Sequence, residues 1–387
     1  MRNRRALALT GLLVAFLIVR VVAVVLALSG AIPHFDIQRF LQIAHANGRP
    51  YAAYAVEYPP VFVVVLKLLG AAFPDDGVFT VAVVAISMAA ELLMAVLLWR
   101  AWSARAALLF LFIDSFLIGL FLVRLDLVVT ALALAAVVAC MRSRALRAGL
   151  LMVLAIGMKL WPLPLALIGA VIAPRRARRE YVVTVVAAGA ALVAVWIAIG
   201  GGVQAVQQVV TFRGATGWQV ESAVGSFVHL FTREAPYAQS GAQRFGHVPA
   251  GVAPLLTVVA AVVTLLVLLW VNRRTLGSAW VASVGAFLAC STLLSPQFLA
   301  WLIPAGAIAW AAGDVAVGAG VLAVTVLTLL EDWQYPGILE LQPAGLALVV
   351  VRNAALIVVV GVAMHAVWRR RELGQRTAAA LVAPTGA

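Results

Sequence analysis

The sequence is poor in charged residues, and acidic residues are scarcest of all. Its 387 residues include 15 Asp and Glu, and all charged residues together make up 11% of the chain. A soluble domain carries about 25% charged residues, so the composition excludes an ordinary soluble fold. Hydrophobic residues make up 65% of the chain, which predicts an all-α polytopic membrane protein.

Cysteine and histidine are too few for the sites that they usually build. The two cysteines, Cys140 and Cys290, lie in apolar runs, which indicates neither a disulfide framework nor a zinc site. Four of the five histidines show no metal-ligand spacing: His34, His45, His229 and His247. We therefore expect no cofactor, and a divalent metal stays open without being favoured.

Basic residues give the chain a formal net charge of +13, but they fall in short clusters between apolar runs. This distribution is typical of a membrane protein with positive cytoplasmic loops. The clusters, taken as cytoplasmic ends, begin at residues 2, 100, 142, 175, 273 and 369. We therefore expect membrane lipids as partners and no nucleic acid.

The apolar runs between these clusters predict the topology, since a crossing helix needs about 20 apolar residues. The expected spans are 6–28, 78–99, 106–121, 126–141, 146–158, 160–173, 181–200, 252–271, 277–294, 297–312, 315–330 and 344–367. The short run 61–72 carries Lys67 and predicts a surface or re-entrant helix. About twelve crossings put both termini in the cytoplasm, with a membrane domain over 1–368 and a disordered tail over 369–387.

The first external loop, residues 33–60, carries the carboxylates Asp36 and Glu57. From Asp36 onward the spacing predicts a short helix with an apolar face on lipid: Ile37, Phe40, Leu41 and Ala44. Asn47-Gly48 ends this helix, and Pro59-Pro60 fixes the backbone before the next run. The loop would hold an acid at the membrane surface.

This topology, derived from arginine clusters alone, places the unusual polar residues on the external side. They are Asp36, Glu57, Arg124, Asp126, Lys159, Arg213, Trp218, Gln219, Glu221, Ser222, His229, Gln297 and residues 331–336. Charges kept at membrane depth usually mark substrate or ion pathways. Both signs converge on one face, which suits a substrate with a phosphate and hydroxyl groups.

Several of these residues also have a purely structural interpretation. Asp36 could cap the surface helix, and Arg124 could pair with Asp126 at a helix end. Lys159 lies at a break between two half-helices, where it could contact a phosphate or reach the headgroups. Glu221 could serve either the architecture of the long loop 201–250 or sugar binding.

Other polar and aromatic residues lie within the apolar runs. Glu91 and Asp114 each either pair with a neighbouring polar group or line a cavity. Three tryptophans fit an interfacial aromatic belt: Trp161, Trp301 and Trp333.

Four local patterns, taken in order, resemble one group of membrane enzymes. The first is an Asp after the first span, followed by Asn-Gly-Arg-Pro-Tyr and Glu-Tyr-Pro-Pro, and the second is Val-Arg-Leu-Asp-Leu-Val. The third is Gly-Trp-Gln-Val-Glu-Ser-Ala-Val-Gly-Ser in the long loop. The fourth is Leu-Leu-Ser-Pro-Gln-Phe-Leu-Ala-Trp-Leu-Ile-Pro, with Met-Lys-Leu-Trp-Pro upstream of it. The chain resembles the GT-C superfamily of glycosyltransferases. More closely it resembles glycosyltransferase family 87, the polyprenyl-phosphate-mannose-dependent mannosyltransferases.

The resemblance implies a GT-C fold in which Asp36 is the catalytic carboxylate. Many GT-C enzymes have two acids at this point; here His34 stands in the partner position, which leaves metal use open and favours a single base. Donor phosphate candidates are Lys159, Arg124 and Arg213. Candidates for contact with the sugar or acceptor are Glu57, Tyr58, His34, Asp126, Gln219, Glu221 and Gln297.

The implied reaction is inverting transfer of a sugar from a polyprenyl-phosphate donor to a lipid or glycan acceptor, outside the plasma membrane. Mannose is the family's usual sugar, and arabinose is the alternative. A flippase for lipid-linked sugars would need midplane polar groups and often paired repeats. A noncatalytic scaffold would leave the conjunction of Asp36, Lys159 and the long loop without a purpose. The acceptor and the oligomeric state are left open.

Overall fold

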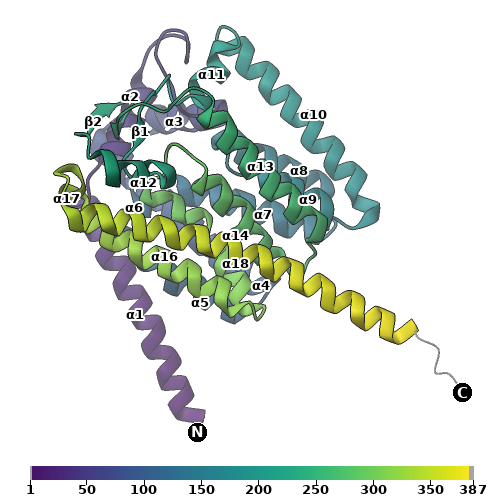
Figure 1. Ribbon diagram of the computed structural model, residues 1–387. Coiled ribbons are helices and arrows are strands. Elements are labelled where there is room, and N and C mark those ends of the chain that lie inside the picture. Colours follow the sequence, from purple (N-terminus) through teal and green to yellow (C-terminus); the bar gives the residue numbers. More distant parts are fainter. Residues whose placement is uncertain (1, 383–387) are drawn as a thin grey trace, which may run out of the picture.

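The computed structural model describes residues 2–382, with side chains described from residue 14 to residue 370. The chain is mainly helical, and its helices pack side by side (Figure 1). Five described helices are long and apolar enough to cross a membrane, by length and composition: Asp76–Ala101, Arg175–Ile199, Val252–Trp270, Val315–Trp333 and Pro343–Arg370. These helices support a membrane protein, while the twelve crossings and the external loop stay predictions.

The segment before the long loop contains helices close to the expected runs. They are α1 (Arg2–Leu28), α2 (Phe35–His45), α3 (Pro60–Ala72), α4 (Asp76–Ala101), α5 (Ala104–Asp114), α6 (Ile118–Leu122), α7 (Asp126–Met141), α8 (Ala145–Met158), α9 (Leu163–Ile172) and α10 (Arg175–Ile199). The break predicted at Lys159 is confirmed, because α8 ends and α9 begins on either side of residues 159–162. Pro162 has no N–H to continue the helix.

The long loop and the C-terminal part follow. They contain α11 (Gln204–Val210), β1 (Trp218–Gln219), α12 (Ala223–Thr232), β2 (Tyr237–Gln239), β3 (Ala242–Phe245), α13 (Val252–Trp270), α14 (Leu276–Ala289), the 3-10 helix η1 (Pro296–Trp301), α15 (Ile303–Ala311), α16 (Val315–Trp333), α17 (Tyr335–Leu339) and α18 (Pro343–Val382). Helix α18 continues past residue 368, where the expected tail begins. Residues 383–387 lie outside the described part, and the division into membrane domain and tail stays a prediction.

Two expected single spans are interrupted. The run 106–121 divides into α5 and α6, and at the break Arg20 donates to the hydroxyl of Ser115 at 2.6 Å and to the carbonyl of Leu111 at 3.0 Å. The run 297–312 divides into η1 and α15 near Pro304, which cannot donate a helical hydrogen bond. The prediction of continuous helices is wrong at both places.

The described chain is mainly helical, as expected, but the long loop also contains a small sheet that the sequence did not predict. Strands β1, β3 and β2 form an antiparallel sheet in that order. Ser240 and Gly241 both have positive φ at the turn between β2 and β3, which suits a two-residue hairpin. The sheet gathers with α2, α3 and α12 at one end of the helix bundle (Figure 1).

The short helix predicted from Asp36 is present as α2, but its apolar face contacts protein. The buried residues of α2 are Ile37, Phe40, Ile43 and Ala44. The Phe40 ring meets the Phe62 ring of α3 edge-on, with centroids 5.4 Å apart. The expected contact of this face with lipid is therefore wrong, because α3 occupies it.

Helices α7 and α14 lie in the core of the bundle, since most residues of each are buried. Trp161 and Trp301 also belong to the core: they are 1% and 4% exposed, and their rings stack with centroids 5.0 Å apart. The prediction of an interfacial belt is wrong for these two. Trp333 is 68% exposed, as that prediction requires.

Candidate active site

Asp36 lies in the first turn of α2 and faces Arg124, which precedes α7. The Nε of Arg124 donates to Oδ2 of Asp36 at 2.6 Å, and its Nη1 donates to the carbonyl of Leu120 at 2.9 Å. The N-cap of α2 is His34, so Asp36 is not the capping residue. Its side chain is 24% exposed, which leaves the carboxylate accessible to a substrate.

Asp126, the first residue of α7, pairs with Lys159 at the break between α8 and α9. The Nζ of Lys159 lies 2.7 Å and 2.9 Å from the two carboxylate oxygens, and Nε1 of Trp301 donates to Oδ1 at 2.8 Å. The side chain of Asp126 is 3% exposed. The carboxylate of Asp126 thus pairs with Lys159, and Arg124 pairs with Asp36 instead of with Asp126.

Tyr58 lies among the carboxylates of this region. Burial, followed by the charges of Glu57, Asp36 and Asp126, raises the pKa of its hydroxyl well above the ordinary value. The hydroxyl therefore keeps its proton and can donate it in a hydrogen bond. The Nζ of Lys159 lies 6.0 Å from the centroid of the Tyr58 ring. Tyr58 thus joins the Asp36 and Asp126 pairs into one site.

Glu57 is held by two arginines. The Nε and Nη2 of Arg39 donate to its two oxygens at 2.9 Å and 2.7 Å, which is a bidentate pair. The Nε of Arg213 lies 3.4 Å from Oε2. The sequence predicted Glu57 and Arg213 but not Arg39. Arg39 could have been predicted as a site residue, because it lies in the same short helix as Asp36.

Gln219 and Glu221 lie together in the long loop. The side-chain amide of Gln219 donates to Glu221, and its Oε1 accepts from the backbone N–H of Leu294 at 3.0 Å. This ties the loop to the segment that leads into η1. Burial and the charge of Glu331 raise the pKa of Glu221 to about 8. Glu221 therefore binds a proton more tightly than an ordinary glutamate.

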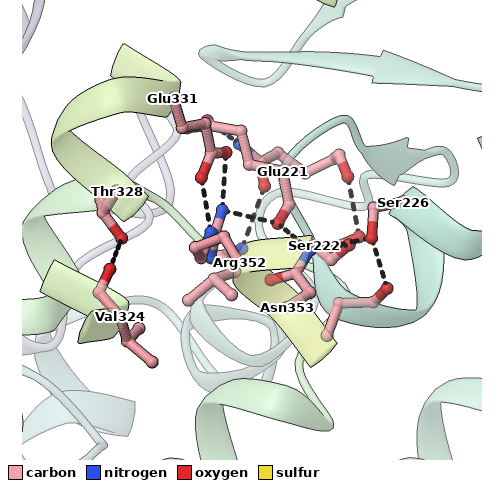
Figure 2. A network of polar contacts seen from close by, with 11 residues as sticks. Glu221, Ser222, Ser226, Val324, Thr328, Glu331, Arg352 and Asn353 are labelled. Carbon is pink, nitrogen blue, oxygen red and sulfur yellow. Dashed lines mark hydrogen bonds and ion pairs between the residues drawn. The ribbon is translucent and has the colours of Figure 1, made fainter. Parts of the chain in front are cut away.

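A buried network anchors this loop to α16 and α18 (Figure 2). Arg352 donates to both oxygens of Glu331, from Nε at 2.5 Å and from Nη2 at 2.7 Å, and to the carbonyl of Glu221 at 3.1 Å. Asn353 donates to the carbonyls of Glu221 and Ser222 and to the hydroxyl of Ser226. Sequence reasoning missed Arg352 and Asn353, although two polar residues inside the run 344–367 were a usable signal.

A comparison with protein families identifies the group of enzymes to which the chain belongs. Residues 56–296 match the family model of glycosyltransferase family 87. The chain belongs to glycosyltransferase family 87. The match includes Glu57, Arg124, Asp126, Lys159 and the long loop, whereas Asp36 precedes it. A comparison with curated proteins returned no match.

The remaining predicted site residues of this family 87 glycosyltransferase are less closely tied to Asp36. The ring of His34 bonds through Nε2 to the carbonyl of Ala27 in α1, at 2.6 Å. Gln297 is half-buried on η1, in the segment that also carries Phe298 and Trp301. The Phe298 ring centroid lies 5.2 Å from Nζ of Lys159.

A second buried charge cluster lies apart from these residues, between α1, α4 and α5. Arg20 donates to Glu91 from Nε at 2.9 Å and from Nη2 at 2.5 Å, and its Nη2 lies 3.8 Å from Asp114. Glu91 and Asp114 are both fully buried. The sequence left open whether Glu91 and Asp114 pair with a neighbouring polar group or line a cavity. In the structure they pair with a neighbouring polar group. Arg20 was not predicted as their partner.

Proposed function

We propose that this family 87 glycosyltransferase moves a sugar, most often mannose, from a polyprenyl-phosphate donor to a lipid or glycan acceptor on the extracytoplasmic face of the plasma membrane. The observation that carries the proposal is the pair Asp36–Arg124, an accessible carboxylate beside a guanidinium, next to the Lys159–Asp126 pair. A base and two cations at one site suit transfer from a phosphate leaving group.

Asp36 acts as the general base. It takes the proton of the acceptor hydroxyl while the hydroxyl oxygen forms a bond to C1 of the sugar. The bond between C1 and the phosphate oxygen breaks, and its electron pair leaves with the lipid phosphate. Attack on the side opposite the phosphate inverts the anomeric centre, so a β-linked donor gives an α-linked product.

Cations stabilise the charge that gathers on the leaving phosphate. Lys159 and Arg124 are the proposed phosphate ligands beside Asp36, and Arg213 is the third. Each of the first two is close to a carboxylate, which keeps it in place before the donor arrives. No metal takes part in this mechanism.

The sugar and the acceptor bind through the neighbouring polar side chains. Gln219, Glu221 and Gln297 hydrogen-bond sugar hydroxyls, and Tyr58 donates from its protonated hydroxyl. Glu57 and Asp126 orient the arginines and the lysine around the acceptor. His34, tied to α1, fixes the start of α2 and borders the acceptor.

The test is transfer of labelled mannose from polyprenyl-phosphate-mannose in membranes that contain the wild type, Asp36→Ala or Asp76→Ala. Asp76 is an exposed acid in the first turn of α4, so its variant is the matched control. We expect the wild type and the control to form product and Asp36→Ala to form none. EDTA should change none of these results. Normal turnover by Asp36→Ala would refute the assignment of Asp36 as the general base. Product from polyprenyl-phosphate-arabinose but not from polyprenyl-phosphate-mannose would show that the donor sugar is arabinose.

A further inference from the structure

A buried charge cluster between α1, α4 and α5 takes no part in the proposed reaction. It contains two carboxyl groups, Glu91 and Asp114, which are both 0% exposed, and one guanidinium group, Arg20, which is 8% exposed. If both carboxyl groups were ionised, the cluster would bury one negative charge without a compensating cation. Such a charge is costly to bury, and the group that carries it usually neutralises instead.

Arg20 binds mainly one of the two carboxyl groups. Its Nε and Nη2 donate to Oε1 of Glu91 at 2.9 Å and 2.5 Å. Its Nη1 donates to the hydroxyl of Ser115, and its Nη2 also donates to the carbonyl of Leu111. Oδ2 of Asp114 lies 3.8 Å from Nη2, which is too long for a hydrogen bond. Asp114 is therefore left without a cation in direct contact.

Asp114 instead contacts the other carboxyl group. Among the described residues, Oδ1 and Oδ2 of Asp114 and Oε2 of Glu91 are buried oxygens without a nitrogen or hydroxyl donor. The Asp114 side chain is hydrogen-bonded to that of Glu91. An ionised carboxyl group can only accept hydrogen bonds, so this bond requires a proton on one of the two residues. One bound proton supplies the missing donor and balances the charge of the cluster.

The neighbouring helices add no further charge to the cluster, within the residues that the structure describes. Helices α6 and α15, which pack against α1 and α5, have no ionisable side chain. The charged side chains of α2, α3 and α7 have other partners: Asp36, Arg39, Lys67 and Asp126. The remaining charged or titratable residues of α2, α4 and α5 are exposed: His45, Asp76, Arg100 and Arg105. Arg20 is thus the cation that faces both carboxyl groups.

The cluster holds a helix that has few other buried side chains. In the described part of α1, Arg20, Ala23 and Ala27 are the buried residues, at positions i, i+3 and i+7 of one face. Toward its N-terminus α1 extends away from the other helices (Figure 1). Since alanine side chains are small, Arg20 is the long side chain that connects α1 to the core.

Helices α1 and α6 each lead to one residue of the Asp36–Arg124 pair. The ring of His34, at the start of the helix that carries Asp36, is bonded to the carbonyl of Ala27 in α1. The carbonyl of Leu120 in α6 accepts from Arg124. Helix α6 follows the break at which the guanidinium of the cluster binds. The cluster therefore adjoins both supports of the pair.

We propose that Glu91 and Asp114 form a binding site for a single shared proton, which allows Arg20 to hold α1 against α4 and α5. With the proton bound, one carboxylate faces one guanidinium, and Arg20 also keeps its bonds to Leu111 and Ser115. Release of the proton places two negative charges side by side in a buried position, where they repel each other. The attachment of α1 to the bundle is thereby sensitive to pH.

The first test is infrared spectroscopy of the purified full-length protein at neutral pH in dodecyl maltoside, a detergent without a carbonyl group. A protonated carboxyl group has a C=O stretching band that a carboxylate lacks. We expect Asp114→Asn and Glu91→Gln each to remove the band of one protonated carboxyl group. The double variant should remove no more, because the two residues share one proton. Asp76→Asn changes an exposed acid of α4 and should remove none.

The second test is the unfolding equilibrium of the wild type and Asp114→Asn in the same detergent at several pH values. Unfolding releases the proton that the folded cluster holds, so the wild type should lose stability relative to Asp114→Asn as the pH rises. The ratio of the two unfolding constants should change about tenfold per pH unit for one proton. A ratio that does not depend on pH would contradict the proposal.

Three infrared or stability results would overturn the shared proton. An unchanged band in both single variants would show that no proton is bound, and wild-type stability that requires Na⁺ rather than choline would assign the site to a metal cation. Loss of a second band in the double variant would show two separate protons. Circular dichroism shows whether each variant is folded, and if one single variant is not, the other decides. Neither test measures sugar transfer, so failure of the proposed reaction would be seen separately.

Discussion

The Nε of Arg124 donates to Oδ2 of Asp36 at 2.6 Å, although 88 positions separate the two residues in the chain. Asp36 is positioned by the first turn of α2, and Arg124 by the bond of its Nη1 to the carbonyl of Leu120. The hydroxyl of Ser87 in α4 also donates to the Arg124 carbonyl, at 2.6 Å. The arginine thus connects the proposed base to the core of the bundle.

We expect Arg124→Gln to lower the turnover of sugar transfer by about 10–100-fold, because misplacement of a reacting group by about 1 Å has an effect of this size. The variant keeps the general base but loses the donor that orients it. The measurement is kcat with labelled donor. Arg49→Gln, which removes an exposed arginine of the loop that carries Asp36, should keep wild-type turnover. Equal loss of turnover in both variants would argue against a specific role for Arg124.

Lys159→Met should destabilise the folded protein by about 3–5 kcal/mol, because it leaves the buried carboxylate of Asp126 without its cation. The double variant Lys159→Met/Asp126→Asn should recover most of this loss. Thermal unfolding in detergent measures both. Lys67→Met is the control, because it removes the other lysine of the chain, which donates to the carbonyl of Ala46. It should lower the free energy of unfolding by only about 1 kcal/mol. No recovery in the double variant would contradict the pairing.

Glu221→Gln should gain stability relative to the wild type as the pH rises from about 5 to about 8. The pKa of Glu221 is about 8 in the folded protein, against 4.5 for an ordinary glutamate. Between these values the unfolded chain releases the proton that the folded chain keeps, so this carboxyl makes wild-type stability fall as pH rises. Unfolding midpoints at four pH values test this, with Glu234→Gln as the charge-matched control. A pH-independent difference would show that Glu221 does not titrate in this way.

Gly277→Ala should lower stability by about 1–3 kcal/mol through overpacking. A Cβ on Gly277 would lie 2.5 Å from the backbone nitrogen of Ala309 and 2.8 Å from the carbonyl oxygen of Ala305, so α14 and α15 would have to separate. Gly361→Ala is the control, because a Cβ there meets no atom within 4 Å. Thermal unfolding of the two variants side by side measures the difference, and equal midpoints would refute the close packing.

Much of the secondary structure could be predicted because the chain is so apolar. A helix satisfies every backbone polar group internally, which long apolar runs in lipid require, and most expected runs became helices. The break at Lys159 followed from Pro162. The interruption between α5 and α6 could not be predicted, because it accompanies contacts from Arg20, a residue of α1.

The candidate site was predictable in its residue types but not in its pairs. The sequence indicated Asp36, Arg124, Asp126 and Lys159 as costly charges on one face, yet the neighbours Arg124 and Asp126 suggested a local pair that does not form. Arg39 and Arg352 were missed, since their partners Glu57 and Glu331 lie 18 and 21 positions away.

The sequence by itself thus determined the membrane class, most helices and the scarce charged groups, because composition and local spacing carry that information. The tertiary structure alone decided which cation faces which carboxylate, and that two tryptophans expected at the interface are core residues. The physical reason is that such contacts depend on the rotation and register of packed helices. Neither is set by the periodicity of any single helix.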